Sequence, residues 1–154
     1  MDKREVKIDY FVYQNSFAVG YEKLCKKAMQ ASAKSYSIYS NFAVGAAVLL
    51  ENGKIVSGNN QENAAYPSGL CAERTALFYA GATYPEVAVK ALAIVACDQG
   101  IPCDNFVSPC GACRQVFAEI VKRYGRDFDV IMCGKQETVV VKASALLPFV
   151  FDLN

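Results

Sequence analysis

Nine consecutive apolar residues, Phe42 to Leu50, constrain the fold of this chain more than any other feature. A run of this length falls far short of the roughly 20 residues that a helix needs to span a bilayer. It is rich in small and β-branched residues, and Asn52-Gly53, a dipeptide typical of tight hairpin turns, follows it. The sequence therefore predicts a buried strand over 42–50 that turns back into a second strand over 55–58.

Apolar periodicity predicts helices and strands along the rest of the chain. Helical spacing of apolar side chains over 17–32 indicates an amphipathic helix, with Asn15 or Ser16 as its candidate cap. The other expected elements are helices over 71–80, 110–124 and 143–147, and strands over 90–97, 128–133 and 138–142. Gly81 is placed to end the helix over 71–80, and Gly125 to end the helix over 110–124.

This order of elements predicts an α/β fold with about five strands, in a mixed sheet because hairpin strands run antiparallel. The 154 residues correspond to one domain. We place that domain at residues 16–154. Residues 1–15 are polar and mixed, and we expect them to form an N-terminal arm without an assigned role.

Composition and charge exclude several classes of function. Hydrophobic residues make up 53% of the chain, which argues against disorder. Sixteen Lys and Arg residues balance fifteen Asp and Glu residues, so no basic excess supports binding to nucleic acid. The N-terminus lacks the apolar stretch of a signal peptide, and no run is long enough for a membrane span. We expect a cytoplasmic protein with reduced thiols.

The chain contains no histidine and seven cysteines. The absence of histidine excludes Ser-His-Asp and Cys-His catalysis and every His-ligated metal site. Acid–base chemistry at neutral pH must therefore fall to a carboxylate, a thiolate, Lys or Tyr. An odd number of cysteines in a chain of this length does not favour a disulfide framework.

Three of the cysteines stand at the starts of two expected helices. Cys71 opens the first, and Cys110 and Cys113 open the second with the spacing that places both thiols on one helix face. Helix N-termini lower the pKa of thiols. Three thiolates form a plausible zinc site whose open fourth position is typical of catalytic zinc. A redox pair, or a structural site closed by Cys97 or Cys103, is the alternative interpretation.

Glu73 favours the catalytic interpretation, because a carboxylate beside a metal ion's water is what metal-assisted hydrolysis needs. Cys71-Ala72-Glu73, followed by Pro109-Cys110-Gly111-Ala112-Cys113, resembles the signature of the zinc-dependent nucleoside deaminases. The first ligand is Cys rather than His, as in the small homotetrameric cytidine deaminases. The resemblance spans the chain from about Tyr21 to Phe151.

The resemblance implies a fold and a reaction. The fold is a three-layer sandwich with helices on both faces of the sheet. The reaction is the hydrolytic deamination of cytidine and 2′-deoxycytidine, a step of pyrimidine salvage, with one Zn²⁺ per chain bound by Cys71, Cys110 and Cys113. Glu73 would move protons between water, the ring N3 and the departing amine. Arg74 is expected to offset the charge of the thiolates, and Gln115 is a second, weaker candidate for that role.

The resemblance also implies which residues bind the nucleoside. Asn60 and Glu62 match the residues that bind the ribose hydroxyls, Phe42 matches the aromatic under the pyrimidine ring, and the backbone of Ala64 matches a contact to the base. In the tail, Phe151 matches a residue that reaches into a neighbour's site, and Tyr66 is a second candidate for contact between subunits. A homotetramer with shared active sites is the implied assembly.

Three other functions remain open from the sequence. They are a deaminase of a modified aminoacyl nucleoside antibiotic, a zinc-stapled binding module without catalysis, and a polynucleotide deaminase. Asn60 and Glu62 favour a plain ribose over the antibiotic, and a purely structural site has no use for Glu73. Balanced charge and a Cys first ligand argue against a polynucleotide. No chemistry is assigned to the remaining cysteines, Cys25, Cys97, Cys103 and Cys133.

Overall fold

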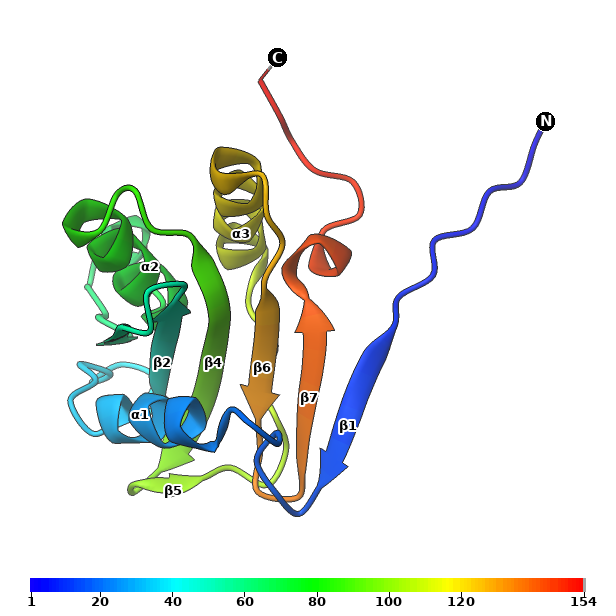
Figure 1. Ribbon diagram of the computed structural model, residues 1–154. Helices are drawn as coiled ribbons and strands as arrows, with labels where there is room; N and C mark the ends of the chain where they lie inside the picture. The colour runs from blue at the N-terminus through cyan, green and yellow to red at the C-terminus, as the bar shows by residue number, and fades with distance from the viewer. Residues whose placement is uncertain (154) are drawn as a thin grey trace.

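A central sheet of seven strands organises the computed structural model, which describes residues 1–153 (Figure 1). The strands are β1 (Tyr10–Gln14), β2 (Ala43–Leu50), β3 (Ile55–Asn59), β4 (Val89–Asp98), β5 (Ile101–Pro102), β6 (Asp129–Cys133) and β7 (Glu137–Lys142). Their order is β1-β7-β6-β4-β2-β3, with β5 paired to β4. Strands β4 and β6 are parallel, and the other paired strands within 1–153 run antiparallel.

Helices cover both faces of this sheet. Helix α1 (Glu22–Ser32) packs on one face, against a cluster that includes Ala47, Val95 and Ile131. Helices α2 (Ala72–Thr83) and α3 (Gly111–Tyr124) pack on the other, against a cluster that includes Val48 and Ile94. Two short 3₁₀ turns, η1 (Tyr66–Ser68) and η2 (Ala143–Leu146), complete the elements. The expected three-layer α/β sandwich is confirmed.

Two glycines let the helices approach the sheet closely. A Cβ built on Gly45 in β2 would lie 1.9 Å from the carbonyl oxygen of Ala28 in α1. A Cβ built on Gly58 in β3 would lie 2.6 Å from the backbone nitrogen of Ala76 in α2. Real Cβ atoms do not approach backbone atoms so closely. A residue with a side chain at either position would therefore push a helix off the sheet.

The structure corrects several expected boundaries. Helix α1 begins at Glu22 rather than near residue 17, because Gly20 has a φ of +84° and Tyr21, not Asn15 or Ser16, takes the cap position. Gly81 does not end α2, which continues to Thr83. The hairpin turn at Asn52-Gly53 is confirmed, with Gly53 at a φ of +83°.

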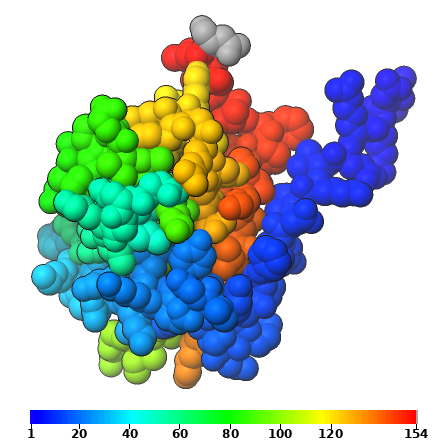
Figure 2. Space-filling view, viewed as in Figure 1, coloured from blue at the N-terminus to red at the C-terminus, as the bar shows by residue number. Residues whose placement is uncertain are grey.

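The sheet has seven strands rather than about five, because β1 and the two-residue β5 add to the expected set. Strand β1 forms within the expected arm and pairs with β7, so residues 1–9 leave the sheet at its edge (Figures 1 and 2). Gly125 ends α3 in the left-handed conformation, as expected. In the described part of the chain, no helix combines the length and apolar character needed to cross a membrane.

Replacing Gly45 by Ala should lower the free energy of unfolding by at least about 2 kcal/mol, because the added methyl group overlaps the backbone of α1. Gly81→Ala is the matched control. Its Cβ would meet only the guanidinium of Arg123, at 3.5 Å, and Ala is the better helix former by up to about 1 kcal/mol. Chemical denaturation of both variants measures the difference, and equal midpoints would contradict the close packing of α1.

Candidate active site

Three thiols from two helix starts meet at one point in the structure. The Sγ atoms of Cys71 and Cys110 are 3.7 Å apart, and those of Cys110 and Cys113 are 3.5 Å apart. All three sulfurs lie within 4.8 Å of one another. Cys113 is buried, Cys71 is half-buried and Cys110 is exposed. The cluster therefore opens toward solvent on one side.

Both helices present their N-termini to this cluster. Cys71 is the cap residue of α2 and Cys110 is the cap residue of α3, each in an extended backbone conformation. Neither side chain caps its helix by a hydrogen bond, so both sulfurs remain available. The partial positive charges of the two helix ends favour thiolates at this point.

The positive charge of Arg74 also stabilises a thiolate in this cluster. Its Nη2 donates to the Sγ of Cys71 over 3.7 Å, and its Nε is buried without a hydrogen-bond partner. Hydrogen bonding from Cys113, assisted by Arg74, lowers the pKa of Cys71 to about 5. The predicted role of Arg74 in offsetting negative charge on sulfur agrees with this geometry.

Glu73 lies in the first turn of α2 and is 5% exposed. Burial, together with the negative charge at Cys71, raises the pKa of this carboxyl to about 7. A carboxyl with a pKa near neutrality can both accept and release a proton in one reaction cycle. The environment of Glu73 therefore suits general acid–base catalysis.

The donor set fits a zinc ion. Sulfur ligands lie about 2.3 Å from tetrahedral zinc, which corresponds to sulfur–sulfur distances of about 3.8 Å. The observed distances of 3.5 and 3.7 Å are close to that value. Within residues 1–153 this is the one group of Cys, Asp and Glu side chains arranged to hold a metal ion, and it includes neither Cys97 nor Cys103.

Asn60 and Glu62 lie beside the thiols because the segment after β3 pairs with Leu70. Gln61 and Leu70 exchange two backbone hydrogen bonds of 2.9 Å, which brings residues 60–62 next to Cys71. Asn60 accepts a hydrogen bond from the backbone of Val44 and donates one to the carbonyl of Phe42, each over 2.8 Å.

Glu62 is held by the loop that precedes β2. Its carboxylate accepts hydrogen bonds from the backbone N–H groups of Tyr39, over 2.8 Å, and Ser40, and from the Ser40 hydroxyl. These bonds lower the pKa of Glu62, with the Ser40 hydroxyl as the main cause. Ser40 is a residue that the sequence reasoning missed. The signal that could have found it is its position two residues before Phe42, in the segment Tyr39-Ser40-Asn41-Phe42.

A cavity of about 300 Å³ joins these groups. Asn60, Glu62, Tyr66, Cys71 and Arg74 all line it. Tyr39, Gln61, Asn63, Gly69 and Leu70 complete the lining. The structure thus gathers five of the predicted site residues around one hollow of a size suited to a small polar molecule.

Seven predicted residues lie outside that lining. Cys110 and Cys113 complete the thiol cluster with Cys71, Glu73 is buried in the first turn of α2, and the other four lie elsewhere. Phe42 and Ala64 are exposed on neighbouring loops. Gln115 on α3 donates a hydrogen bond of 2.9 Å to the carbonyl of Phe151, so its amide anchors the tail and is not directed at a thiol. The side chain of Phe151 is 71% exposed. In this single chain, Phe151 therefore contributes nothing to the cavity beside Cys71.

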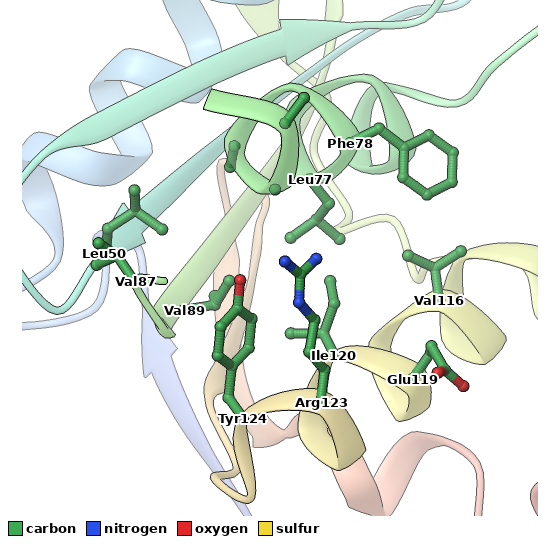
Figure 3. Close-up of a pocket in the computed structure, with 13 residues that line it drawn as sticks. Leu50, Leu77, Phe78, Val87, Val89, Val116, Glu119, Ile120, Arg123 and Tyr124 are labelled. Atoms are coloured by element: carbon green, nitrogen blue, oxygen red, sulfur yellow. The ribbon is translucent and has the colours of Figure 1, made fainter. Parts of the chain in front are cut away.

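A second cavity, of about 390 Å³, lies between α2 and α3 (Figure 3). Apolar side chains line most of it, among them Leu77, Val116 and Ile120, and the guanidinium of Arg123 lies among them, below Leu77 in the view of Figure 3. None of the three clustered thiols, nor Glu73, lines this cavity. Its lining includes the carboxylate of Glu119 but none of the clustered metal-binding side chains of the described residues, so it is not the candidate site.

Cys110→Ala and Cys113→Ala should each lose most of the bound metal, because two thiols no longer complete the three-ligand set. Cys103→Ala is the matched control, since this half-buried thiol lies outside the cluster and its loss should leave the metal content unchanged. Metal analysis of the purified variants is the measurement. Full metal content in either ligand variant would show that the ligand set is misassigned.

Comparison with known proteins agrees with this geometry. The family model of the cytidine and deoxycytidylate deaminase zinc-binding region matches residues 19–124. The chain is 43% identical to a cytidine deaminase of Halalkalibacterium halodurans over 138 residues, which cover 86% of this chain and 97% of the relative. It is 50% identical to a cytidine deaminase of Sporosarcina psychrophila over 132 residues, which cover 85% and 90% of the two chains.

Solved structures give the same result. The crystal structure of cytidine deaminase from Burkholderia pseudomallei aligns with a TM-score of 0.72 at 38% identity, covering 86% of this chain and all of that one. Cytidine deaminase from Mycobacterium tuberculosis aligns with a TM-score of 0.69 at 34% identity, covering 88% and 100%. Together with the thiol cluster and the buried Glu73, these matches show that the chain belongs to the cytidine and deoxycytidylate deaminase family of zinc-binding proteins.

Proposed function

We propose that this protein is a cytidine deaminase, which converts cytidine and 2′-deoxycytidine with water into uridine and 2′-deoxyuridine and releases ammonia. The buried Glu73 beside three clustered thiols is the observation that carries this proposal. Loss of cytidine absorbance on incubation with the protein tests it. A chelator should abolish the change, and added zinc should restore it.

Glu73 carries the proton transfers of the proposed reaction. Zinc, when held by Cys71, Cys110 and Cys113, lowers the pKa of a water molecule and so supplies a nucleophile for C4 of the pyrimidine. Glu73 would accept one proton from that water and pass it to N3 of the ring. It would then take the second proton, from the hydroxyl group now on C4, and deliver it to the departing amine. A carboxyl whose pKa lies near 7 because it is buried can perform each of these steps at neutral pH.

The charge of the three thiolates requires compensation. Three thiolates and one Zn²⁺ sum to a net charge of −1, which would lower the Lewis acidity of the metal ion. Arg74, which donates to the sulfur of Cys71, withdraws part of that charge. The N-termini of α2 and α3 contribute further positive potential at Cys71 and Cys110.

Asn60 and Glu62 are proposed to bind the ribose. A carboxylate accepts about four hydrogen bonds, and Glu62 receives three from Tyr39 and Ser40, so it can accept one more from a ribose hydroxyl. Phe42 is proposed to lie under the pyrimidine ring, and the backbone of Ala64 to contact the base. Tyr66, at the edge of the cavity, is proposed to contact substrate or a neighbouring subunit.

We further propose a homotetramer that shares its active sites. The apolar cavity between α2 and α3 and the exposed ring of Phe78 offer a surface for packing between subunits (Figure 3). The tail carries Phe149, Phe151 and Leu153, each more than 70% exposed. Phe151 is proposed to cover the nucleoside in a neighbouring subunit. Pyrimidine salvage in the cytoplasm is the proposed setting.

Glu73→Gln should keep the fold, the zinc and nucleoside binding but reduce turnover by about 10²–10⁴-fold or more, because Gln preserves the size of the side chain and cannot move protons. Steady-state kinetics, with metal analysis of the same samples, measures the effect. The control is Glu86→Gln, which alters an exposed carboxylate in the loop after α2. If Glu73→Gln keeps more than about a tenth of the turnover, the assigned mechanism is wrong.

Phe151→Ala should raise KM several-fold without altering zinc content, because contact between the ring and the base is lost; aromatic pairs contribute about 0.5–1.5 kcal/mol beyond area burial. Phe149→Ala, in the same exposed tail, is the matched control and should leave KM close to its original value. Initial rates over a range of cytidine concentrations provide the measurement.

Mixing the Phe151→Ala and Glu73→Gln variants tests whether sites are shared. After subunit exchange, some sites combine an intact Glu73 with a neighbour's intact Phe151, so the mixture should be more active than the sum of its parts. Mass spectrometry of labelled subunits verifies the exchange. No gain after verified exchange, or a kinetically silent Phe151→Ala, would refute shared sites and leave the chemistry at Glu73 unaffected.

A further inference from the structure

The N-terminal arm extends past the end of its partner strand. Tyr10 pairs with Val141, and β7 ends one residue later, at Lys142, where the turn η2 begins. Residues 1–9 therefore continue beyond β1 without a strand beside them (Figures 1 and 2). The other side of β1 is also free, because β1 is the first strand in the order of the sheet.

Residues 5–9 have the alternation of an amphipathic strand, and Arg4 stands at the outer end of the apolar face. Val6 and Ile8 continue the spacing of Tyr10 and Val12, and these four side chains are between 43% and 59% exposed. Ile8, Tyr10 and Val12 line one groove of about 380 Å³ beside β7, so the even-numbered side chains share a face.

Charged side chains occupy the opposite face of this segment. They alternate in sign as Lys3, Glu5, Lys7 and Asp9. Lys3 and Glu5 form an exposed ion pair of 3.6 Å, as expected for neighbours on one face of an extended chain. A segment with strand periodicity, a mostly apolar face and no partner strand within residues 1–153 is open to pairing with another chain.

We propose that residues 3–9 pair antiparallel with the same residues of a second copy, about a two-fold axis at Val6. In this register Lys3 lies opposite Asp9 of the second copy, and Glu5 lies opposite its Lys7. The two-fold axis repeats both contacts, so four opposite-charge pairs form on one face. Val6 meets Val6 of the second copy on the apolar face.

Neighbouring registers are disfavoured by charge. A shift by two residues in one direction places Lys3 opposite Lys7, and in the other direction it places Glu5 opposite Asp9. A shift by one residue sets the charged face of one copy against the apolar face of the other. The charge pattern therefore selects both the partner, a second copy of this chain, and the register.

This contact goes beyond the proposed deaminase activity. The family match begins at residue 19, so the segment lies outside the region that this chain shares with the family model. The arm also lies apart from the cavity that holds Asn60, Glu62 and Cys71. Pairing through the arm joins two copies by main-chain hydrogen bonds between their residues 3–9, whichever other faces the subunits use.

A cysteine at Val6 tests the register. Val6→Cys places two thiols directly opposite each other across the axis, at a Cα separation of about 4.5–5.5 Å that a disulfide can bridge. In the control Lys3→Cys, the two cysteines lie six residues apart along the strands, or roughly 20 Å. The zinc-loaded full chain is incubated with oxidised glutathione, and covalent dimer is measured on a non-reducing gel against the unaltered chain. Dimer should form from Val6→Cys and remain at background in Lys3→Cys.

Charge exchange tests the partner assignment. Adding Glu5→Lys to Val6→Cys sets like charges opposite each other and should lower the yield of covalent dimer several-fold. Adding Lys7→Glu as well restores opposite charges and should restore the yield. Equal yields from Val6→Cys and Lys3→Cys would overturn the proposal. So would a yield that is insensitive to Glu5→Lys, or one that the second charge change fails to restore.

Discussion

The close approach of α2 to β3 is the constraint on which the site depends. The absence of a side chain at Gly58 lets the first turns of α2 rest directly on the strand, with Ala72 and Ala76 fully buried there. This contact fixes Cys71 at the start of α2 and holds Glu73 inside the protein. The same strand leads into residues 60–62. The contact between α2 and β3 therefore positions both the candidate metal ligand Cys71 and the candidate ribose-binding residues Asn60 and Glu62.

Local spacing made the chemistry predictable from the sequence. Cys71 and Glu73 are two residues apart, and Cys110 and Cys113 form one helical turn, so each half of the site is encoded within a few residues. The lack of histidine removed most competing ligand sets. Cys71 and Cys110 are far apart in the sequence and meet only because α2 and α3 begin near the same place on the sheet. The order of the strands in this α/β sheet brings the two helix starts together.

Long-range contacts limited the rest of the prediction. Strand β1 (Tyr10–Gln14) lies near one end of the chain and pairs with β7 near the other. Its local sequence does not predict which strand it pairs with. The start of α1 was placed too early because Phe17 continues the helical spacing although Gly20 breaks the helix. The hydrogen bonds of Ser40 and Gln115 likewise depend on loop and tail positions that periodicity does not describe.

The proposed all-sulfur ligand set has a consequence for how the protein matures. Sulfur atoms 3.5 to 3.7 Å apart suit a metal ion. In a metal-free chain two such neighbouring thiols are also open to oxidation to a disulfide, for which they must move together to about 2.05 Å. A chain oxidised in this way would have lost two of its three ligands. Zinc and oxidants therefore compete for the same atoms, and the order in which a newly folded chain meets them determines whether it becomes an enzyme. Loading with metal protects these thiols as well as activating them.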